Sequence, residues 1–251
     1  MNPVLLIAAK ERRALLRDRR GLLWLLAFSV VLSAFALLLV SNRELSLLDN
    51  AMVVYMMAGV VTAAGALIAV ILGSDAFAGE RERHTLVPLL TAPITSGQIL
   101  SGKAIGLFAA WGVMYILAMP YVWAVGSDAR NLVASVLCLT VLGTPVVIGF
   151  GFLAMALSAR TGSVMVSLMT SLIVLLFAAL PLVLDPSLRD SVIGRVLDMV
   201  NPFAGALNTY DATIVDREGV FRQIGRLALV WSWLVLAFWA ARHAVRKPRF
   251  R

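Results

Sequence analysis

The residues from Gly97 to Lys103 have the spacing GxxxxGK, which in a P-loop cradles the phosphates of a nucleotide. That chemistry also needs a hydroxyl directly after the lysine to bind Mg²⁺, and Ala104 stands at that position. It further needs a strand before the loop and a helix after it, whereas here no strand pattern precedes and a long apolar run follows. The sequence therefore predicts no phosphate site at this place. Gly102 and Gly106 instead form a small-xxx-small pair, which favours close packing of two helices.

The other side chains able to do chemistry are too scattered to form a catalytic site. The two histidines, His84 and His243, lie in different segments, and the lone thiol of Cys138 lies inside an apolar run. The HExxH, GxSxG and CxxC patterns are absent from the sequence. Serines and threonines in the apolar runs have no neighbouring base and are expected to hydrogen-bond between helices. We therefore predict that the chain is not an enzyme and that it holds no metal or cofactor.

Six apolar runs dominate the sequence, and none of them contains Asp, Glu, Lys, Arg or His. The runs are Gly21–Val40, Ala51–Leu72, Ala104–Val125, Leu132–Leu157, Val164–Leu184 and Leu227–Ala241. A helix needs roughly 20 apolar residues to cross the hydrocarbon of a bilayer. The sequence predicts an all-α membrane protein, a single transmembrane domain over residues 1–251 with six transmembrane helices. Because the runs carry no ionisable group at mid-depth, any driving machinery is expected outside the bilayer or on another chain.

The basic residues set the orientation of the runs, and their clustering at the run borders accounts for the net charge of +8 without a nucleic-acid partner. If the first segment is inside, fifteen Lys and Arg residues fall on inside segments and two on the short outside segments. Cytoplasmic segments carry such an excess, so both termini are predicted to be cytoplasmic. The sixth run is short for a crossing, so either Arg226 and Arg242 snorkel or the helix starts earlier.

Residues 1–20 precede the first run and are predicted to form an in-plane amphipathic helix. Leu5, Ala8, Ala9 and Leu16 fall near one face, and basic residues populate the rest. A helix of this kind lies at the headgroups with its basic side toward anionic lipid. The alternative is an unstructured topogenic tail.

Ser74–Lys103, between the second and third runs, is the most distinctive segment of the sequence. It contains four alternating charges that cannot lie in lipid and are predicted to extend the second helix into the cytoplasm, namely Glu80, Arg81, Glu82 and Arg83. Leu86, Leu89 and Leu90 follow at helical spacing, and Pro93 ends that turn. A short amphipathic helix of this kind suits docking onto another protein, and the alternative is an ordinary solvated loop.

Asp185–Gly225, between the fifth and sixth runs, is predicted to be an external helical loop. Apolar residues in its first half follow helical spacing until Asn201 and Pro202 break the pattern. The segment Phe203–Tyr210 is apolar enough to dip into the membrane. The loop either lids a pathway or covers the outer face of the protein.

The stretch FAGERERHTLVPLLTAPITSGQILSGK, residues 77–103, resembles the signature of ABC-2-type transporter permeases, in which a run like ERERGTLEPLLATPVSR…LLGK follows the second helix. The rest of the architecture is similar over the whole chain, including a long last external loop with an Asn-Pro-Phe segment and a basic tail. Two positions depart from the pattern, with His84 where Gly is common and Val87 where Glu is common. Both lie in the segment expected to make the docking contact.

The resemblance implies half of a transporter in the cell membrane. The chain would pair with a second copy of itself or with a paralogous permease, and each would sit on a separate ABC ATPase subunit that binds ATP and Mg²⁺. On this basis the ATPase-docking residues are Glu80, Arg81, Glu82, Arg83, His84, Thr85, Leu86, Leu89 and Leu90, and the external gate candidates are Asn201, Pro202 and Phe203. Export is the expected direction. The alternatives are a haem-exporter-type subunit of cytochrome assembly and a membrane scaffold without transport.

Overall fold

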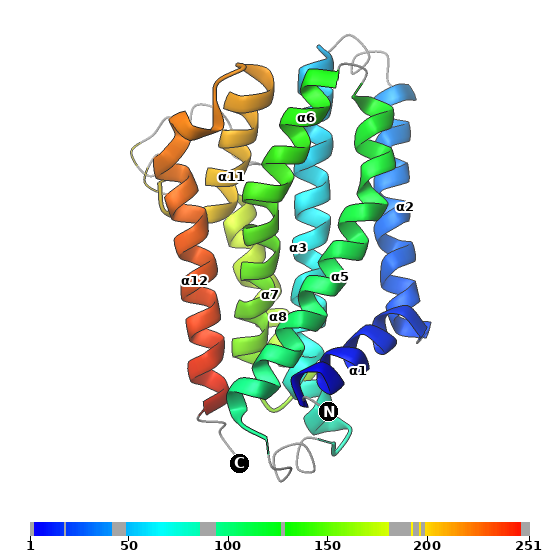
Figure 1. Ribbon diagram of the computed structural model, residues 1–251, viewed down its shortest axis with the longest axis vertical. Coiled ribbons are helices and arrows are strands. Elements are labelled where there is room, and N and C mark those ends of the chain that lie inside the picture. Colours follow the sequence, from blue (N-terminus) through cyan, green and yellow to red (C-terminus); the bar gives the residue numbers. More distant parts are fainter. Residues whose placement is uncertain are drawn as a thin grey trace.

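The computed structural model describes residues 3–17, 19–41, 49–85, 94–126, 129–180, 192, 196 and 199–246, and in this part of the chain all regular structure is helical (Figure 1). The helices are α1 (Pro3–Arg17), α2 (Arg19–Ser41), α3 (Asn50–Glu82), α5 (Ser96–Val125), α6 (Ala129–Cys138), α7 (Thr144–Ser158), α8 (Val164–Ala179), α11 (Pro202–Tyr210) and α12 (Ile224–Arg246). Short π-helical segments are Leu139–Gly143 and Asp211–Val215, and a 3₁₀ turn spans Val220–Gln223. The predicted all-α class is confirmed.

The central helix of the bundle is α3, which packs most extensively on α7 and also contacts α2, α5 and α8 (Figure 1). The close approach of α3 to α7 depends on Gly73, where a Cβ would collide with the carbonyl oxygen of Gly151 and come within 2.8 Å of the Cβ of Ala154. Large side chains fill the interior of the bundle, among them Phe28, Met57, Ile99, Phe150 and Tyr210, all fully buried.

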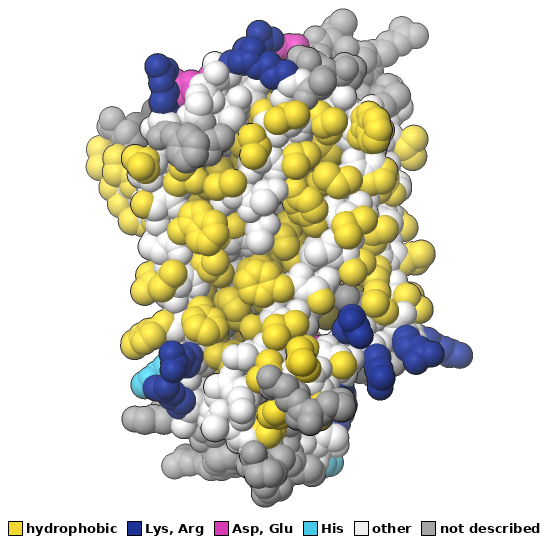
Figure 2. Space-filling model, in the orientation of Figure 1, with side chains coloured by type: hydrophobic (Ala, Val, Ile, Leu, Met, Phe, Trp, Pro, Cys, Tyr) yellow, Lys and Arg dark blue, Asp and Glu magenta, His cyan; other side chains and the backbone are white. Residues whose placement is uncertain are grey.

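Five described helices are long and apolar enough to cross a membrane, namely Gly21–Leu39, Asn50–Glu82, Ser96–Val125, Arg130–Ser158 and Ile224–Arg246. Their outward faces carry large apolar side chains, among them Leu26, Leu37, Ile116 and Trp123. Figure 2 shows the hydrophobic side chains as a broad band, with Lys and Arg gathered beyond each end of the band. This distribution is that of a multi-pass helical membrane protein.

The fifth predicted crossing, Val164–Leu184, corresponds to the shorter apolar helix α8, which ends at Ala179. Residues 181–184 lie outside the described part of the chain. The six-helix topology therefore stays a prediction.

The helix α5 starts well before the apolar run that predicted it, at Ser96 rather than Ala104. Thr95 and Gln98 form a capping box that fixes this start. The Gln98 N–H donates to Thr95 Oγ1 (3.2 Å), and the Thr95 N–H donates to Gln98 Oε1 (2.8 Å). The helix therefore includes Lys103 and both glycines of the small-xxx-small pair.

Two other helices also extend beyond their apolar runs. The predicted extension of the second helix is confirmed, because α3 continues to Glu82. The helix α12 begins at Ile224 and continues to Arg246, so the earlier start that was an alternative for the sixth run is the observed one.

The helix α1 lies across the end of the bundle that carries both chain termini, at a steep angle to the other helices (Figure 1). We call this end the termini face. A separate N-terminal helix was predicted and is confirmed, and it packs mainly on α5. Ile7 and Ala8 of α1 are buried, whereas Leu5 and Leu16 are exposed. The predicted apolar face stays a prediction. The position of α1 in the plane of a membrane stays a prediction.

The helix α11 lies inside the bundle, in contact with α12, α8 and α3. The predicted break at Asn201 and Pro202 is confirmed, because Asn201 is the N-cap of α11 and Pro202 is its first residue. Almost all of α11 is buried, so its apolar composition serves packing within the protein. The helix predicted in the first half of the external loop falls largely outside the described residues.

Candidate functional site

The candidate site begins where α3 ends, at the termini face (Figure 1). The His84 N–H donates to the Arg81 carbonyl (3.0 Å) and the Thr85 N–H donates to the Glu80 carbonyl (2.9 Å). These two hydrogen bonds are those of a Schellman motif, which places His84 in the left-handed region, with φ of 57°. Glycine is favoured there because it has no Cβ. The departure at His84 therefore falls where the backbone itself favours glycine.

One acidic side chain of this helix end points inward. Glu80 is 5% exposed, and its carboxylate accepts hydrogen bonds from Lys10 and Thr85. Lys103 approaches the same carboxylate oxygen as Lys10, with its Nζ 3.7 Å from Glu80 Oε1 and 2.8 Å from Glu11 Oε1. These four charged residues, Lys10, Glu11, Glu80 and Lys103, join α1, α3 and α5, and we call them the inner charge cluster.

The lysine of the apparent P-loop belongs to the inner charge cluster. The side chain of Lys103 is 2% exposed, and its Nζ also lies 5.4 Å from the centroid of the Phe77 ring. A buried ammonium needs nearby negative charge to offset its lost hydration. The two carboxylates supply this charge, so the lysine has a structural partner set within the chain.

The glycines around Lys103 have the packing role that their spacing predicted. A Cβ at Gly102 would lie 2.6 Å from Cβ of Ile7, and a Cβ at Gly106 would lie 2.6 Å from Cβ of Glu11. The prediction of close helix packing is confirmed, and the partner helix is α1. Close contact of α1 with α5 in turn brings Glu11 to Lys103.

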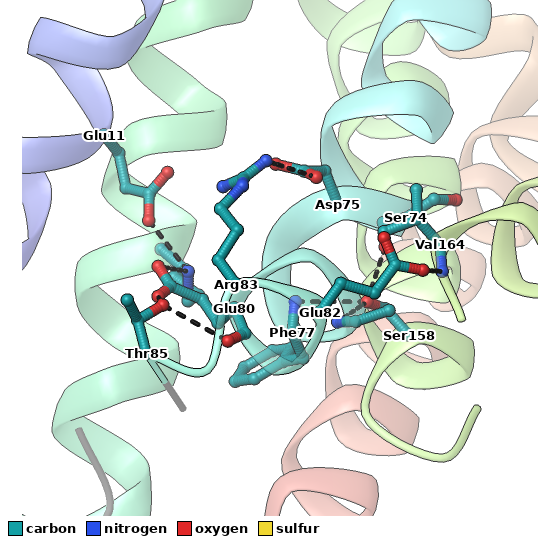
Figure 3. Close-up of polar contacts among 12 residues, drawn as sticks. Glu11, Ser74, Asp75, Phe77, Glu80, Glu82, Arg83, Thr85, Ser158 and Val164 are labelled. Carbon is teal, nitrogen blue, oxygen red and sulfur yellow. Dashed lines mark hydrogen bonds and ion pairs between the residues drawn. The ribbon is translucent and has the colours of Figure 1, made fainter. Parts of the chain in front are cut away.

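Two other charged residues at this end of α3 reach the connection between α7 and α8 and the start of α8. Arg81 donates to the carbonyl of Thr161, and Glu82 Oε1 accepts from the N–H of Val164, the first residue of α8 (2.8 Å, Figure 3). Arg83 stays on its own helix, where it donates to both carboxylate oxygens of Asp75 at 2.8 Å each. Hydrogen bonding to Asp75 raises the pKa of the Arg83 guanidinium above its ordinary value.

A serine hydroxyl from α7 joins the main chain of α3 just before these charged residues. Ser158 Oγ donates to the Ser74 carbonyl (2.6 Å) and accepts from the N–H groups of Phe77 (3.1 Å) and Ala78 (2.8 Å). The hydroxyl therefore bridges the Ser74 carbonyl and the Ala78 N–H, two groups that a regular helix would join directly by an i to i−4 hydrogen bond. The hydroxyl uses its one donor and two acceptor sites on a single neighbouring helix.

The sequence-predicted docking residues are placed unevenly. His84 and Thr85 are exposed, whereas Glu80 is buried and contacts residues of its own chain. Leu86, Leu89 and Leu90 lie outside the described residues. The docking role of the whole set stays a prediction.

The three external gate candidates are all buried, at the start of α11. Asn201 Oδ1 accepts from the N–H groups of Phe203 (3.0 Å) and Ala204 (3.4 Å), and Asn201 Nδ2 donates to the carbonyl of Ala178 near the end of α8 (2.6 Å). The Phe203 ring packs edge-on against Phe150, with centroids 6.4 Å apart. Their role as a gate stays a prediction.

Sequence reasoning missed the parts of the site that depend on contacts between distant segments. It assigned no partner to Lys103, Glu11 or Ser158, because each contact joins helices far apart in the sequence. The one available signal was Glu11, an acidic residue within a strongly basic N-terminal helix. Among the described residues, no group of three His, Cys, Asp or Glu side chains is placed to hold a metal ion.

Comparison with known proteins places the chain in a family. Residues 5–212, most of the chain, match the family model described as ABC-2 family transporter protein. A stretch of 111 residues is 37% identical to the probable ABC transporter permease protein NosY of Stutzerimonas stutzeri. The similarity covers 42% of this chain and 39% of that relative, so the chain matches less than half of the relative's length.

Proposed function

The chain belongs to the ABC-2 transporter family, and on that premise we propose that it is the membrane-spanning permease subunit of an ATP-driven ABC exporter. The observation that carries the proposal is the end of α3, which buried ion pairs hold in place. A Schellman turn leads from there into the rest of the predicted docking segment, residues 80–90. A segment that receives force from a partner needs a rigid base. The inner charge cluster supplies such a base by joining three helices.

The proposed partner is a separate ABC ATPase subunit, which binds ATP and Mg²⁺ and hydrolyses the nucleotide. In this proposal Glu80, Arg81, Glu82 and Arg83 fix the end of α3 through their ion pairs and hydrogen bonds, and the exposed His84 and Thr85 begin the contact surface. Leu86, Leu89 and Leu90 would complete it with an apolar face. The chain itself would hold no cofactor, because Ala104 replaces the Mg²⁺-binding hydroxyl and Lys103 is held by carboxylates.

We also propose that the chain works as a pair, with a second copy of itself or a paralogous permease. Each copy would cross the cell membrane six times, with α8 and the residues after it forming the fifth crossing. The buried start of α11, with Asn201, Pro202 and Phe203, would form part of the outer gate.

The function is tested by purifying the chain with and without its ATPase, taken as the product of an adjacent gene that encodes Walker A and Walker B motifs. We expect the two subunits to copurify and labelled ATP to bind only when the ATPase is present. Saturable micromolar ATP binding by the chain alone, lost in Lys103→Ala, would contradict the proposal. Failure of the two subunits to copurify would favour the membrane scaffold instead.

The proposed topology makes a second prediction, measured with an impermeant maleimide on whole cells. Single cysteines at Ser46, Ser96 and Ser187 are placed in a Cys138→Ala background. We expect labelling at positions 46 and 187 and none at 96, because the basic residues place position 96 inside. The native thiol of Cys138 is buried, so its replacement changes little surface. Labelling at position 96 alone would reverse the topology.

A further inference from the structure

The helix α8 is joined to other helices by hydrogen bonds at both of its ends. At its start, the N–H of Val164 donates to Glu82 Oε1 of α3 at 2.8 Å (Figure 3). In its last turn, the carbonyl of Ala178 accepts from Asn201 Nδ2, the N-cap of α11, at 2.6 Å. Both contacts pair a main-chain group that a helix end leaves without an intrahelical partner. Side chains distant in sequence therefore hold the two termini of this helix.

Between its ends α8 packs on α3 and α7. Its buried residues are Ser167, Ser171 and Leu175, which recur every four positions and form one stripe. The Ser171 hydroxyl bonds the Ser167 carbonyl of the same helix (2.8 Å), so it does not tie α8 to a neighbour. The two serines of the stripe allow close approach of α8 to its neighbours.

The start of α8 is attached to the end of α3 that leads into the docking segment. Glu82 is the last residue of α3 and lies three residues before Thr85, the last described residue of that segment. The connection before α8 is held as well, through Ser158 on the main chain of α3 and through Arg81 on the Thr161 carbonyl. A displacement of the end of α3 therefore acts on three residues in turn, Ser158, Thr161 and Val164.

The opposite end of α8 is attached to α11 by a single bifunctional side chain. The Asn201 amide oxygen caps α11 through the N–H groups of Phe203 and Ala204, while the amide nitrogen binds Ala178. A carboxamide can do both because it carries an acceptor and two donors on one planar group. The side chain is 8% exposed, so water competes little for these bonds.

We propose that α8 transmits movement of the docking segment to α11, with Glu82 and Asn201 as the positioning residues at its two ends. The inference rests on the proposed function, since it takes the docking segment as the place where the ATPase acts. It adds that movement of the docking segment reaches α11 through the two ends of α8. The gate candidates at the start of α11 move with it.

The experiment measures amide hydrogen exchange by mass spectrometry on the complex of this chain with its ATPase, with and without a non-hydrolysable ATP analogue. In the unmodified complex we expect the analogue to change exchange in residues 79–85, 164–170 and 202–210. The test variant is Asn201→Ser, which keeps an N-cap acceptor but has no amide donor to reach Ala178. We expect this variant to keep the analogue-induced change in exchange in 164–170. The change in 202–210 should fall by roughly two- to tenfold, the factor that corresponds to the free energy of one such hydrogen bond.

A matched control and a second variant separate transmission from simple loss of structure. Thr209→Ala removes a buried hydroxyl of α11 that donates to the Gly205 carbonyl of its own helix (2.8 Å). It should leave the exchange responses in 164–170 and 202–210 unchanged. Asn201→Asp also keeps the cap and, when ionised, lacks the donor, so it should behave like Asn201→Ser. Mere weakening of α11 would raise its exchange equally with and without nucleotide.

The outcomes that overturn the inference differ from those that overturn the proposed function. If the complex forms and the analogue changes 79–85 without changing 164–170, α8 does not receive the movement. If both Asn201 variants keep the full response in 202–210, the joint at Asn201 does not pass it on. If the complex does not form, or the analogue changes none of the three segments, the proposed function itself fails and the inference fails with it.

Discussion

Replacement of Lys103 with methionine is expected to lower the free energy of unfolding by about 3 kcal/mol, because the buried Glu80 keeps only the exposed Lys10 as its counter-charge and Glu11 loses its ion-pair partner. The side chain of Lys103 is 2% exposed and lies 2.8 Å from Glu11 and 3.7 Å from Glu80. Methionine matches the length of the lysine stem, so most of the loss comes from the missing charge. Denaturant unfolding of the purified chain in mild detergent measures the change.

Two further variants identify the origin of this loss. Lys10→Met should cost at most about 1 kcal/mol, because the Lys10 side chain is 60% exposed and its ion pair with Glu80 is screened by water. The double variant Lys103→Met, Glu80→Met should be more stable than Lys103→Met alone, since the remaining Lys10 and Glu11 balance in charge. A loss below about 1 kcal/mol in Lys103→Met would show that the inner charge cluster does not hold the three helices together.

Replacement of Leu89 or Leu90 with alanine is expected to weaken association with the ATPase roughly tenfold or more. Full burial of one leucine contributes about 1.5–3 kcal/mol, and truncation to alanine removes most of that contribution. Copurification with the ATPase and stimulation of ATP hydrolysis measure the change. Folding should be largely unaffected, because the docking face is expected to lie outside the bundle core.

The control for this prediction is Leu5→Ala, an apolar side chain on α1 that is 61% exposed at the same end of the bundle. It should assemble with the ATPase as the unmodified chain does. If Leu89→Ala and Leu90→Ala reach the membrane normally and still assemble and couple, the segment is not the coupling helix. The functional proposal would then lose its strongest residue-level support.

Features that depend on local chemistry were predictable from the sequence. The four-residue spacing of Gly102 and Gly106 correctly indicated close helix packing, because removal of two Cβ atoms from one helix face creates room for a neighbour. The charges that follow the second apolar run predicted the extension of α3 to Glu82. The Asn-Pro pair at residue 201 marked the start of α11, because an N-cap acceptor before a proline is a local signal.

Features that depend on contacts between distant segments were not predictable in the same way. Nothing near Lys103 in the sequence shows that Glu11 and Glu80 will surround it, and the lysine instead completed a false nucleotide motif. The Ser158 hydroxyl looks like any small polar residue of an apolar helix until α3 lies against it.

The attachment of α1 also sets an order of events during synthesis. Glu11 and Lys103 are 92 residues apart in the chain, and Lys10 and Glu80 are 70 apart. At translation rates of about 5–20 residues per second, α1 is complete for roughly 5–20 s before its partner helix has been made. The contact of α1 with α5 can therefore form only after α2 and α3 have been synthesised.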